Sequence, residues 1–225
     1  MCAEGHRPIC QDTGIVTVFL KIGMNVKWEA KLSLNEMINE GVRRAYKHPD
    51  NVLRPSILLD PAGARKNSGD NTPAVIHTRV VAGDKVEVHL AAKGGGSENK
   101  AKMAMLNPSD SILDWVVETM PKLGAGWCPP GILGIGIGGT AEKSAVLAKE
   151  ALLDSIDIQD LQKRGPQNRT EELRLEIFEA VNNLGIGAQG LGGVTTVLDV
   201  KIKDYPTHAA SLPVTLIPNC AATRH

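Results

Sequence analysis

The chain has 225 residues, which is enough for one large domain or two smaller lobes. Lysine plus arginine and aspartate plus glutamate number 25 each, so the formal net charge of zero gives no support for attraction to nucleic acid or to an anionic membrane. Aromatic residues make up only 3%, which argues against stacking platforms for bases. The sequence also has no apolar run approaching the roughly 20 residues that span a bilayer. We therefore expect neither a nucleic-acid partner nor a membrane partner.

The first residues of the sequence are polar and lack the apolar middle section of a secretion signal. We therefore expect a reducing, cytoplasmic compartment, where cysteines serve as metal ligands or catalysts more often than as disulfides. Four cysteines are too few for a disulfide framework, so each cysteine needs its own explanation.

The first half of the chain contains apolar, β-branched segments that are typical of strands, at residues 14–22, 74–81 and 85–91. A helix is predicted between the first two segments, because Ser33 and Glu36 form a capping-box pattern and an apolar stripe at helical spacing runs to about Tyr46. Gly83-Asp84 fits a hairpin turn between the last two strands.

The second half contains helical patterns at residues 109–120, 140–153 and 170–184, and strand patterns at residues 131–138, 194–202 and 212–217. Residues 93–97 (KGGGS) are expected to form a flexible loop, and residues 156–168 a surface connection. Glycine alternates with Ile or Leu along 131–138, so we interpret these glycines as a packing feature and not as a dinucleotide-binding loop. The irregular alternation of strands and helices predicts a mixed α/β fold.

Three cysteines, Cys10, Cys128 and Cys220, lie at predicted strand ends on loops that contain proline. Rigid strand ends commonly present functional groups. The alternative is that each is a small buried hydrophobic residue, as free cysteines often are, but their proline, glycine and polar neighbours fit that role poorly. Cys2, close to the first residue, is interpreted as a spare thiol.

The three cysteines are 118 and 92 positions apart (128 − 10 and 220 − 128), so the close pairs of a zinc ribbon or a ferredoxin are absent. Widely separated thiolates suit a metal cluster at which several loops converge. Three ligands would leave one iron of a cubane-type cluster open, and an open metal site can bind a carboxylate and a hydroxyl as a Lewis acid. The alternatives are a closed metal site in a non-catalytic scaffold subunit, or three buried thiols that bind no metal.

Four motifs follow one another along the chain: CQDTG at residues 10–14, KGGGS at 93–97, CPPG at 128–131 and PTHAAS at 206–211. In this order they resemble class I, iron–sulfur-dependent fumarate hydratase, in the N-terminal or alpha part that it shares with the L-tartrate dehydratase alpha subunit. The resemblance runs over essentially the entire chain. It implies that residues 1–225 form one mixed-sheet α/β domain of the iron–sulfur hydro-lyase type.

The resemblance further implies that Cys10, Cys128 and Cys220 hold a [4Fe-4S] cluster whose fourth iron faces a small dicarboxylate. It implies catalytic or substrate-binding roles for five more residues: Gln11, Asp12, Arg54, Gly95 (within the loop 94–96) and His208. Asp12 is a candidate for the general base or for a group that orients the base. Four other arginines compete with Arg54 for the carboxylate of the substrate: Arg43, Arg44, Arg65 and Arg79.

The activity implied by the resemblance is the reversible hydration of fumarate to L-malate. The alternatives are an L-tartrate dehydratase alpha subunit or a non-catalytic metal-binding scaffold subunit. The family usually has several tens of residues before its Gln-Asp-Thr-Gly motif, where this sequence has ten, so we expect an N-terminally truncated chain. The C-terminal or beta domain is expected from the same or another chain, and a homodimer is expected by resemblance.

Overall fold

The structure is a computed structural model that describes residue 4, residues 10–50 and residues 53–222. The chain divides into two compact units, which we call unit 1 (up to Gly95) and unit 2 (from Gly96). Each unit has a hydrophobic core of its own. None of the helices within the described ranges combines the length and apolar composition that a membrane crossing requires.

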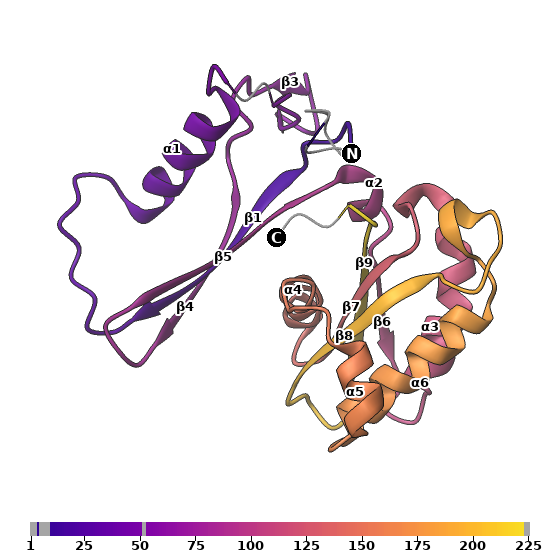
Figure 1. Cartoon of the computed structure of the whole chain (residues 1–225). Helices are drawn as coiled ribbons and strands as arrows, with labels where there is room; N and C mark the ends of the chain where they lie inside the picture. The colour runs from indigo at the N-terminus through magenta and orange to yellow at the C-terminus, as the bar shows by residue number, and fades with distance from the viewer. Residues whose placement is uncertain (1–3, 5–9, 51–52, 223–225) are drawn as a thin grey trace. The chain divides into compact units, whose positions relative to one another are not determined.

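Unit 1 contains a three-stranded sheet in the order β4-β1-β5 (Figure 1). Its strands are β1 (Ile15–Gly23), β4 (Val75–Val81) and β5 (Val86–Lys93). β1 is parallel to β4 and antiparallel to β5, so the predicted hairpin between β4 and β5 is wrong. β1 takes the central place because it is the strand that is apolar and buried on both faces, as Val18 and Phe19 show.

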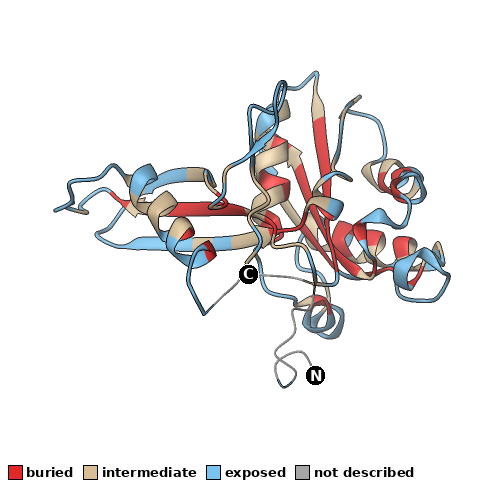
Figure 2. Cartoon of the chain, turned by 90° about the horizontal axis from the view of Figure 1, so that it is seen from above, coloured by how far each residue is buried: buried red, intermediate tan, exposed pale blue. Residues whose placement is uncertain are grey.

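One face of this sheet is covered by α1 (Leu34–Tyr46), whose predicted capping box between Ser33 and Glu36 is confirmed. Figure 2 shows β1 buried between two more exposed strands. The alternating side chains of β5 do share one face, but Val86, Val88 and Leu90 remain 38%, 57% and 48% exposed. The prediction of a half-buried alternating strand therefore has the right spacing, and its apolar face is only partly covered.

Three short elements of this region were not predicted. The strands β2 (Leu58–Leu59) and β3 (Lys66–Asn67) pair with each other. The helical turn α2 (Gly95–Glu98) replaces the expected flexible loop at 93–97, in which Lys93, Gly94 and Ser97 are buried. The prediction of a loop is wrong for this stretch, because residues 95–98 form a helical turn.

Unit 2 contains a four-stranded mixed sheet in the order β6-β9-β7-β8. β7 is parallel to β8, and β9 is antiparallel to both β6 and β7. The predicted mixed α/β fold is thereby confirmed, while the short strand β6 was missed. The strands are β6 (Lys102–Leu106), β7 (Gly131–Gly138), β8 (Val197–Tyr205) and β9 (Leu212–Asn219).

Helices cover both faces of this sheet, with α4 on one face and α3 and α6 on the other (Figure 1). α5 lies within the predicted surface connection, where burial of Ile158 and Leu161 anchors a helix. The α-helices are α3 (Ile112–Thr119), α4 (Ala141–Ala151), α5 (Ile158–Arg164) and α6 (Arg169–Asn183). Short 3₁₀ turns occupy Met120–Leu123, Ala125–Trp127 and Ala188–Gly190.

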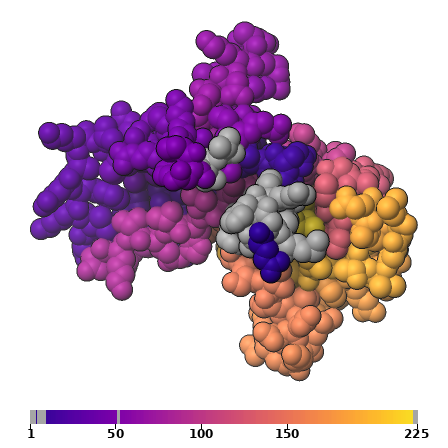
Figure 3. All heavy atoms as spheres, turned by 45° about the horizontal axis from the view of Figure 1, so that its top comes forward, coloured from indigo at the N-terminus to yellow at the C-terminus, as the bar shows by residue number. Residues whose placement is uncertain are grey.

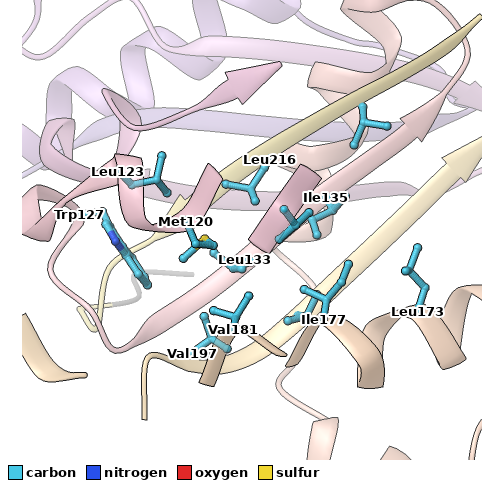
Figure 4. Close-up of a cluster of buried hydrophobic side chains, with 13 residues drawn as sticks. Met120, Leu123, Trp127, Leu133, Ile135, Leu173, Ile177, Val181, Val197 and Leu216 are labelled. Carbon is cyan, nitrogen blue, oxygen red and sulfur yellow. The ribbon is translucent and has the colours of Figure 1, made fainter. Parts of the chain in front are cut away.

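The alternating glycines of β7 face α4. A Cβ atom on Gly136 would lie 1.9 Å from the carbonyl oxygen of Ser144, and one on Gly134 would lie 2.2 Å from that of Ala148. Leu133 and Ile135, between the glycines, point into the larger core on the other face (Figure 4). The interpretation of these glycines as a packing feature is confirmed, because they let the helix approach the strand backbone.

Candidate functional site

The segment that carries Cys10 is attached to the sheet of unit 1 through Asp12. One carboxylate oxygen of Asp12 accepts the N–H of Gly14 at 2.9 Å, and the other accepts the N–H of Gly95 at 2.7 Å. The N–H of Asp12 donates to the sulfur of Cys10 at 3.4 Å. Asp12 therefore links the start of β1 to the glycine-rich turn beside it.

Further hydrogen bonds to the same segment come from α1 and from the buried Asn71. The hydroxyl of Tyr46, at the end of α1, donates to the carbonyl oxygen of Thr13 at 2.7 Å. The fully buried Asn71 donates to the carbonyl oxygen of Gly14 at 3.1 Å and accepts the N–H of Ser56 at 2.7 Å. The backbone after Cys10 is therefore a rigid support and not a loose terminus.

Arg54 lies beside this segment with an exposed side chain. Its Nη2 atom donates to the carbonyl oxygen of Gln11 at 3.3 Å, and its own carbonyl oxygen accepts the hydroxyl of Thr13. Among the competing arginines, Arg43 is held by Asp70 at 2.9 Å, and this contact raises the pKa of its guanidinium. Unit 1 thus brings together five of the predicted site residues: Cys10, Gln11, Asp12, Arg54 and Gly95.

Cys128 and Cys220 lie side by side at one end of the sheet of unit 2. Cys128 precedes β7 and Cys220 follows β9, which is the antiparallel neighbour of β7. The N–H of Ala221 donates to the carbonyl oxygen of Cys128 at 3.3 Å, so the two cysteine loops are hydrogen-bonded to each other. Cys128 has a left-handed backbone (φ 57°), which is uncommon for a residue other than glycine and is often found at functional sites.

A glycine-rich loop at residues 185–196, on the exposed gold-coloured surface in Figure 3, supports the Cys128 turn. The backbone N–H of Gln189 donates to the carbonyl oxygen of Pro129 at 2.8 Å, and its side-chain amide donates to the same oxygen at 3.3 Å. Our sequence reasoning did not identify Gln189. The one available signal was a polar residue inside a glycine run, and this residue has a left-handed backbone (φ 56°).

His208 lies at the opposite end of the same sheet, in the connection between β8 and β9. β9 has eight residues between that connection and Cys220, which at about 3.4 Å per residue corresponds to roughly 25 Å. The Nδ1 atom of His208 accepts the N–H of Ala210 at 3.1 Å. The structure therefore does not bring His208 together with the two cysteines of unit 2.

The donor set suits an iron–sulfur cluster chemically, because Cys10, Cys128 and Cys220 are all free thiols. Within the described ranges, no three His, Cys, Asp or Glu side chains gather at metal-binding distance, and Cys10 belongs to a different unit from the other two thiols. The indole nitrogen of Trp127, next to Cys128 and at one end of the core in Figure 4, is the single buried side-chain N or O atom of the described residues without a partner.

The fold and the thiol positions define a mixed α/β protein that presents sulfur ligands at the ends of its strands. The chain belongs to the fumarate hydratase (Fumerase) family, whose model matches residues 1–225, and family membership makes it a hydro-lyase. It is 41% identical, over 98% of its length and 77% of the relative's, to a putative L(+)-tartrate dehydratase subunit alpha of Methanocaldococcus jannaschii. It is 32% identical, over 97% of its length and 71% of the relative's, to the L(+)-tartrate dehydratase subunit alpha of Escherichia coli strain UTI89. The family resemblance inferred from the four motifs is thereby confirmed.

Proposed function

We propose that this chain is the alpha part of an iron–sulfur hydro-lyase that reversibly adds water to fumarate to form L-malate. The observation that carries the proposal is the hydrogen-bonded pair of loops bearing Cys128 and Cys220, in a chain whose family is that of fumarate hydratase. Two thiols held at one sheet end, with a third before β1, supply the ligand chemistry that a [4Fe-4S] cluster needs.

In this proposal Cys10, Cys128 and Cys220 hold the [4Fe-4S] cluster. When bound, the cluster supplies a Lewis acid that makes the hydroxyl group of the substrate a better leaving group. The exposed Arg54 binds a substrate carboxylate: among the described residues its guanidinium donates to the carbonyl oxygen of Gln11, and its other donors suit a bidentate contact. The exposed amide of Gln11 can donate and accept, which suits a substrate hydroxyl or carboxylate.

Asp12 has a positioning role in this proposal. Both of its carboxylate oxygens accept backbone N–H groups, one from Gly14 and one from Gly95, so the carboxylate holds these two backbone segments in place. We therefore propose that Asp12 orients Gln11 and the Gly95 turn, while the base that removes the C3 proton comes from the C-terminal or beta domain. Gly95 supports the site through the shape of this turn, since its N–H is committed to Asp12.

L(+)-tartrate is the second candidate substrate, because both relatives compared above carry the name of a tartrate dehydratase alpha subunit. That name also supports a separate beta subunit as the source of the remaining site residues. We further propose a homodimeric assembly of such complete units in the cytoplasm, where free thiols stay reduced.

The first test is anaerobic reconstitution of the chain with iron and sulfide, followed by mild oxidation and EPR spectroscopy with and without malate. Loss of one labile iron from a cluster with three protein ligands should produce a three-iron signal. The signal should diminish in Cys10→Ser, Cys128→Ser and Cys220→Ser and persist in Cys2→Ser. The proposal would be refuted if no cluster assembles in the chain alone or in the chain together with the beta subunit. A closed cluster that does not respond to malate would also refute it.

The substrate is decided by a separate measurement. With the beta subunit present, kcat/KM for the dehydration of L-malate is compared with kcat/KM for L(+)-tartrate. We expect malate to be preferred, and a preference for tartrate would replace fumarate hydration by the second candidate while leaving the hydro-lyase chemistry unchanged.

A further inference from the structure

Lys100, which is not among the predicted site residues, lies against the Cys128 turn. If Gly126 carried a Cβ atom, that atom would lie 3.0 Å from Cε and 3.5 Å from Nζ of Lys100. The end of the Lys100 side chain therefore rests on the backbone of Gly126, two residues before Cys128. Lys100, Gly126 and Cys128 all belong to unit 2.

The position of Lys100 is set by backbone packing. Its N–H donates to the carbonyl oxygen of Ser97 at 3.2 Å, so it directly follows the α2 turn. A Cβ atom on Gly96 would lie only 2.9 Å from the carbonyl oxygen of Gly126. The absence of side chains at these two glycines lets the α2 turn and the Cys128 turn approach closely, and this contact carries Lys100 to Gly126.

The ammonium of Lys100 has no carboxylate partner among the residues that the structure describes. The neighbouring acid, Glu98, forms an ion pair with Lys149. Lys100 is half-buried, whereas the most buried cations of unit 2, Arg174 and Lys201, are both neutralised by Asp157 and Asp199. A partly desolvated cation without a counterion favours binding of an anion.

We propose that Lys100 binds a carboxylate group at the Cys128 turn. The identification of this bound group as a substrate carboxylate rests on the proposed function, in which a dicarboxylate must approach the cysteine ligands. A single ammonium is suited to this role because it makes a point-charge contact and tolerates several carboxylate orientations.

The charge of Lys100 can be tested on the metal-free, reduced chain with two alkylating reagents. Iodoacetate carries a carboxylate and iodoacetamide is neutral, and both alkylate a cysteine thiolate with loss of iodide. The rates at Cys128, which is exposed, are followed by mass spectrometry of its peptide. The ratio of the two rates at one thiol cancels the intrinsic reactivity of that thiol and reports the local attraction for a carboxylate.

Lys100→Met should lower the iodoacetate-to-iodoacetamide ratio at Cys128 by roughly two- to five-fold at low salt, as expected for the loss of one nearby charge in a water-like dielectric. The effect should shrink as salt is added. Lys100→Arg should retain the ratio. Lys102→Met is the matched control, because Lys102 is exposed on β6 and its loss changes the net charge equally.

An unchanged ratio in Lys100→Met, or an equal decrease in Lys102→Met, would overturn the proposal. Lys100→Gln provides a second variant with a polar side chain if the methionine variant does not fold. In the cluster-loaded complex with the beta subunit, Lys100→Met should raise KM for the dicarboxylate about ten-fold with a smaller change in kcat. Because alkylation needs no cluster, a lowered ratio in a chain that binds no iron would refute the proposed function and leave the carboxylate site intact.

Discussion

At the scale of single residues, Asp12 connects more of the candidate site than any other side chain described above. It contacts Cys10 through its backbone and two glycines through its carboxylate. Each carboxylate oxygen of Asp12 accepts one N–H, from Gly14 or from Gly95. Replacing the carboxylate by an amide therefore leaves one of these N–H groups facing an NH₂ group. Removing one charge also weakens the remaining hydrogen bond.

We predict that Asp12→Asn increases amide hydrogen exchange at Gly95 by about ten-fold or more, since a lost charge-assisted hydrogen bond is worth roughly 1.5–3 kcal/mol. NMR-detected exchange of the metal-free chain measures this directly. Asp50→Asn is the matched control, because the Asp50 side chain is 91% exposed. Unchanged protection at Gly95 would show that the hydrogen bond to Asp12 does not order the glycine-rich turn.

The residues that sequence reasoning identified were those inside short, ordered motifs. Cys10, Gln11 and Asp12 are adjacent in sequence, and the structure places Arg54 and Gly95 beside them. Lys100 and Gln189 were not identified, because their relation to the Cys128 turn depends on packing between distant segments. His208 shows the converse, since a residue 12 positions before Cys220 in sequence lies at the far end of an intervening strand.

At the scale of elements, the contact between β7 and α4 depends on glycine. Gly136→Ala should destabilise unit 2 by about 3 kcal/mol or more, because the new methyl group would meet the backbone of Ser144 at 1.9 Å and only a shift of the helix relieves the clash. Gly41→Ala is the opposite case: its Cβ meets nothing within 4 Å on the exposed side of α1.

Gly41→Ala should therefore stabilise α1 by about 0.5–1 kcal/mol through helix propensity. Urea denaturation followed by circular dichroism measures both variants. A tolerated alanine at position 136 would mean that α4 is not held against β7 as closely as described.

The attachment of α1 to the loop before β4 depends on pH. Hydrogen bonds from the side chain and N–H of Thr72, together with the Arg43 guanidinium, lower the pKa of Asp70 to about 2. A lowered folded-state pKa means that the ionised carboxylate stabilises unit 1 fully above the unfolded value near 3.8 and that this contribution is lost as the pH falls through about 2.

We predict that Asp70→Asn lowers the free energy of unfolding by a constant amount above about pH 5, and that its difference from the parent chain shrinks between pH 4 and pH 2. Urea titrations across this range test the sign. A difference in the free energy of unfolding that grows as the pH falls would contradict the lowered pKa of Asp70.

The elements themselves were predictable where one local signal dominated. The capping box placed α1, and the glycine alternation placed β7 at 131–138. The pairing of β4 and β5 was wrong because a short turn between two strands says nothing about a third strand inserted between them. α5 was missed because two buried apolar residues in a polar segment carry little periodicity.

At the scale of the whole molecule, the two separate cores have a testable consequence. A fragment of residues 96–223 contains both core clusters of unit 2 and should fold cooperatively on its own. It retains Cys128 and Cys220 but lacks Cys10, so it should not hold a stoichiometric four-iron cluster after reconstitution. Iron and sulfide analysis of the folded fragment measures this, and a full cluster in it would exclude Cys10 as a required ligand.

The edge strand β5 has a consequence for how the purified chain is stored. Edge strands are templates for pairing with another chain, and an apolar face strengthens that tendency. The partly exposed Val86, Val88 and Leu90 lie along such an edge, interrupted by Glu87 and His89 on the opposite face. We therefore expect concentrated samples to self-associate through this strand, and Val88→Lys should reduce that association.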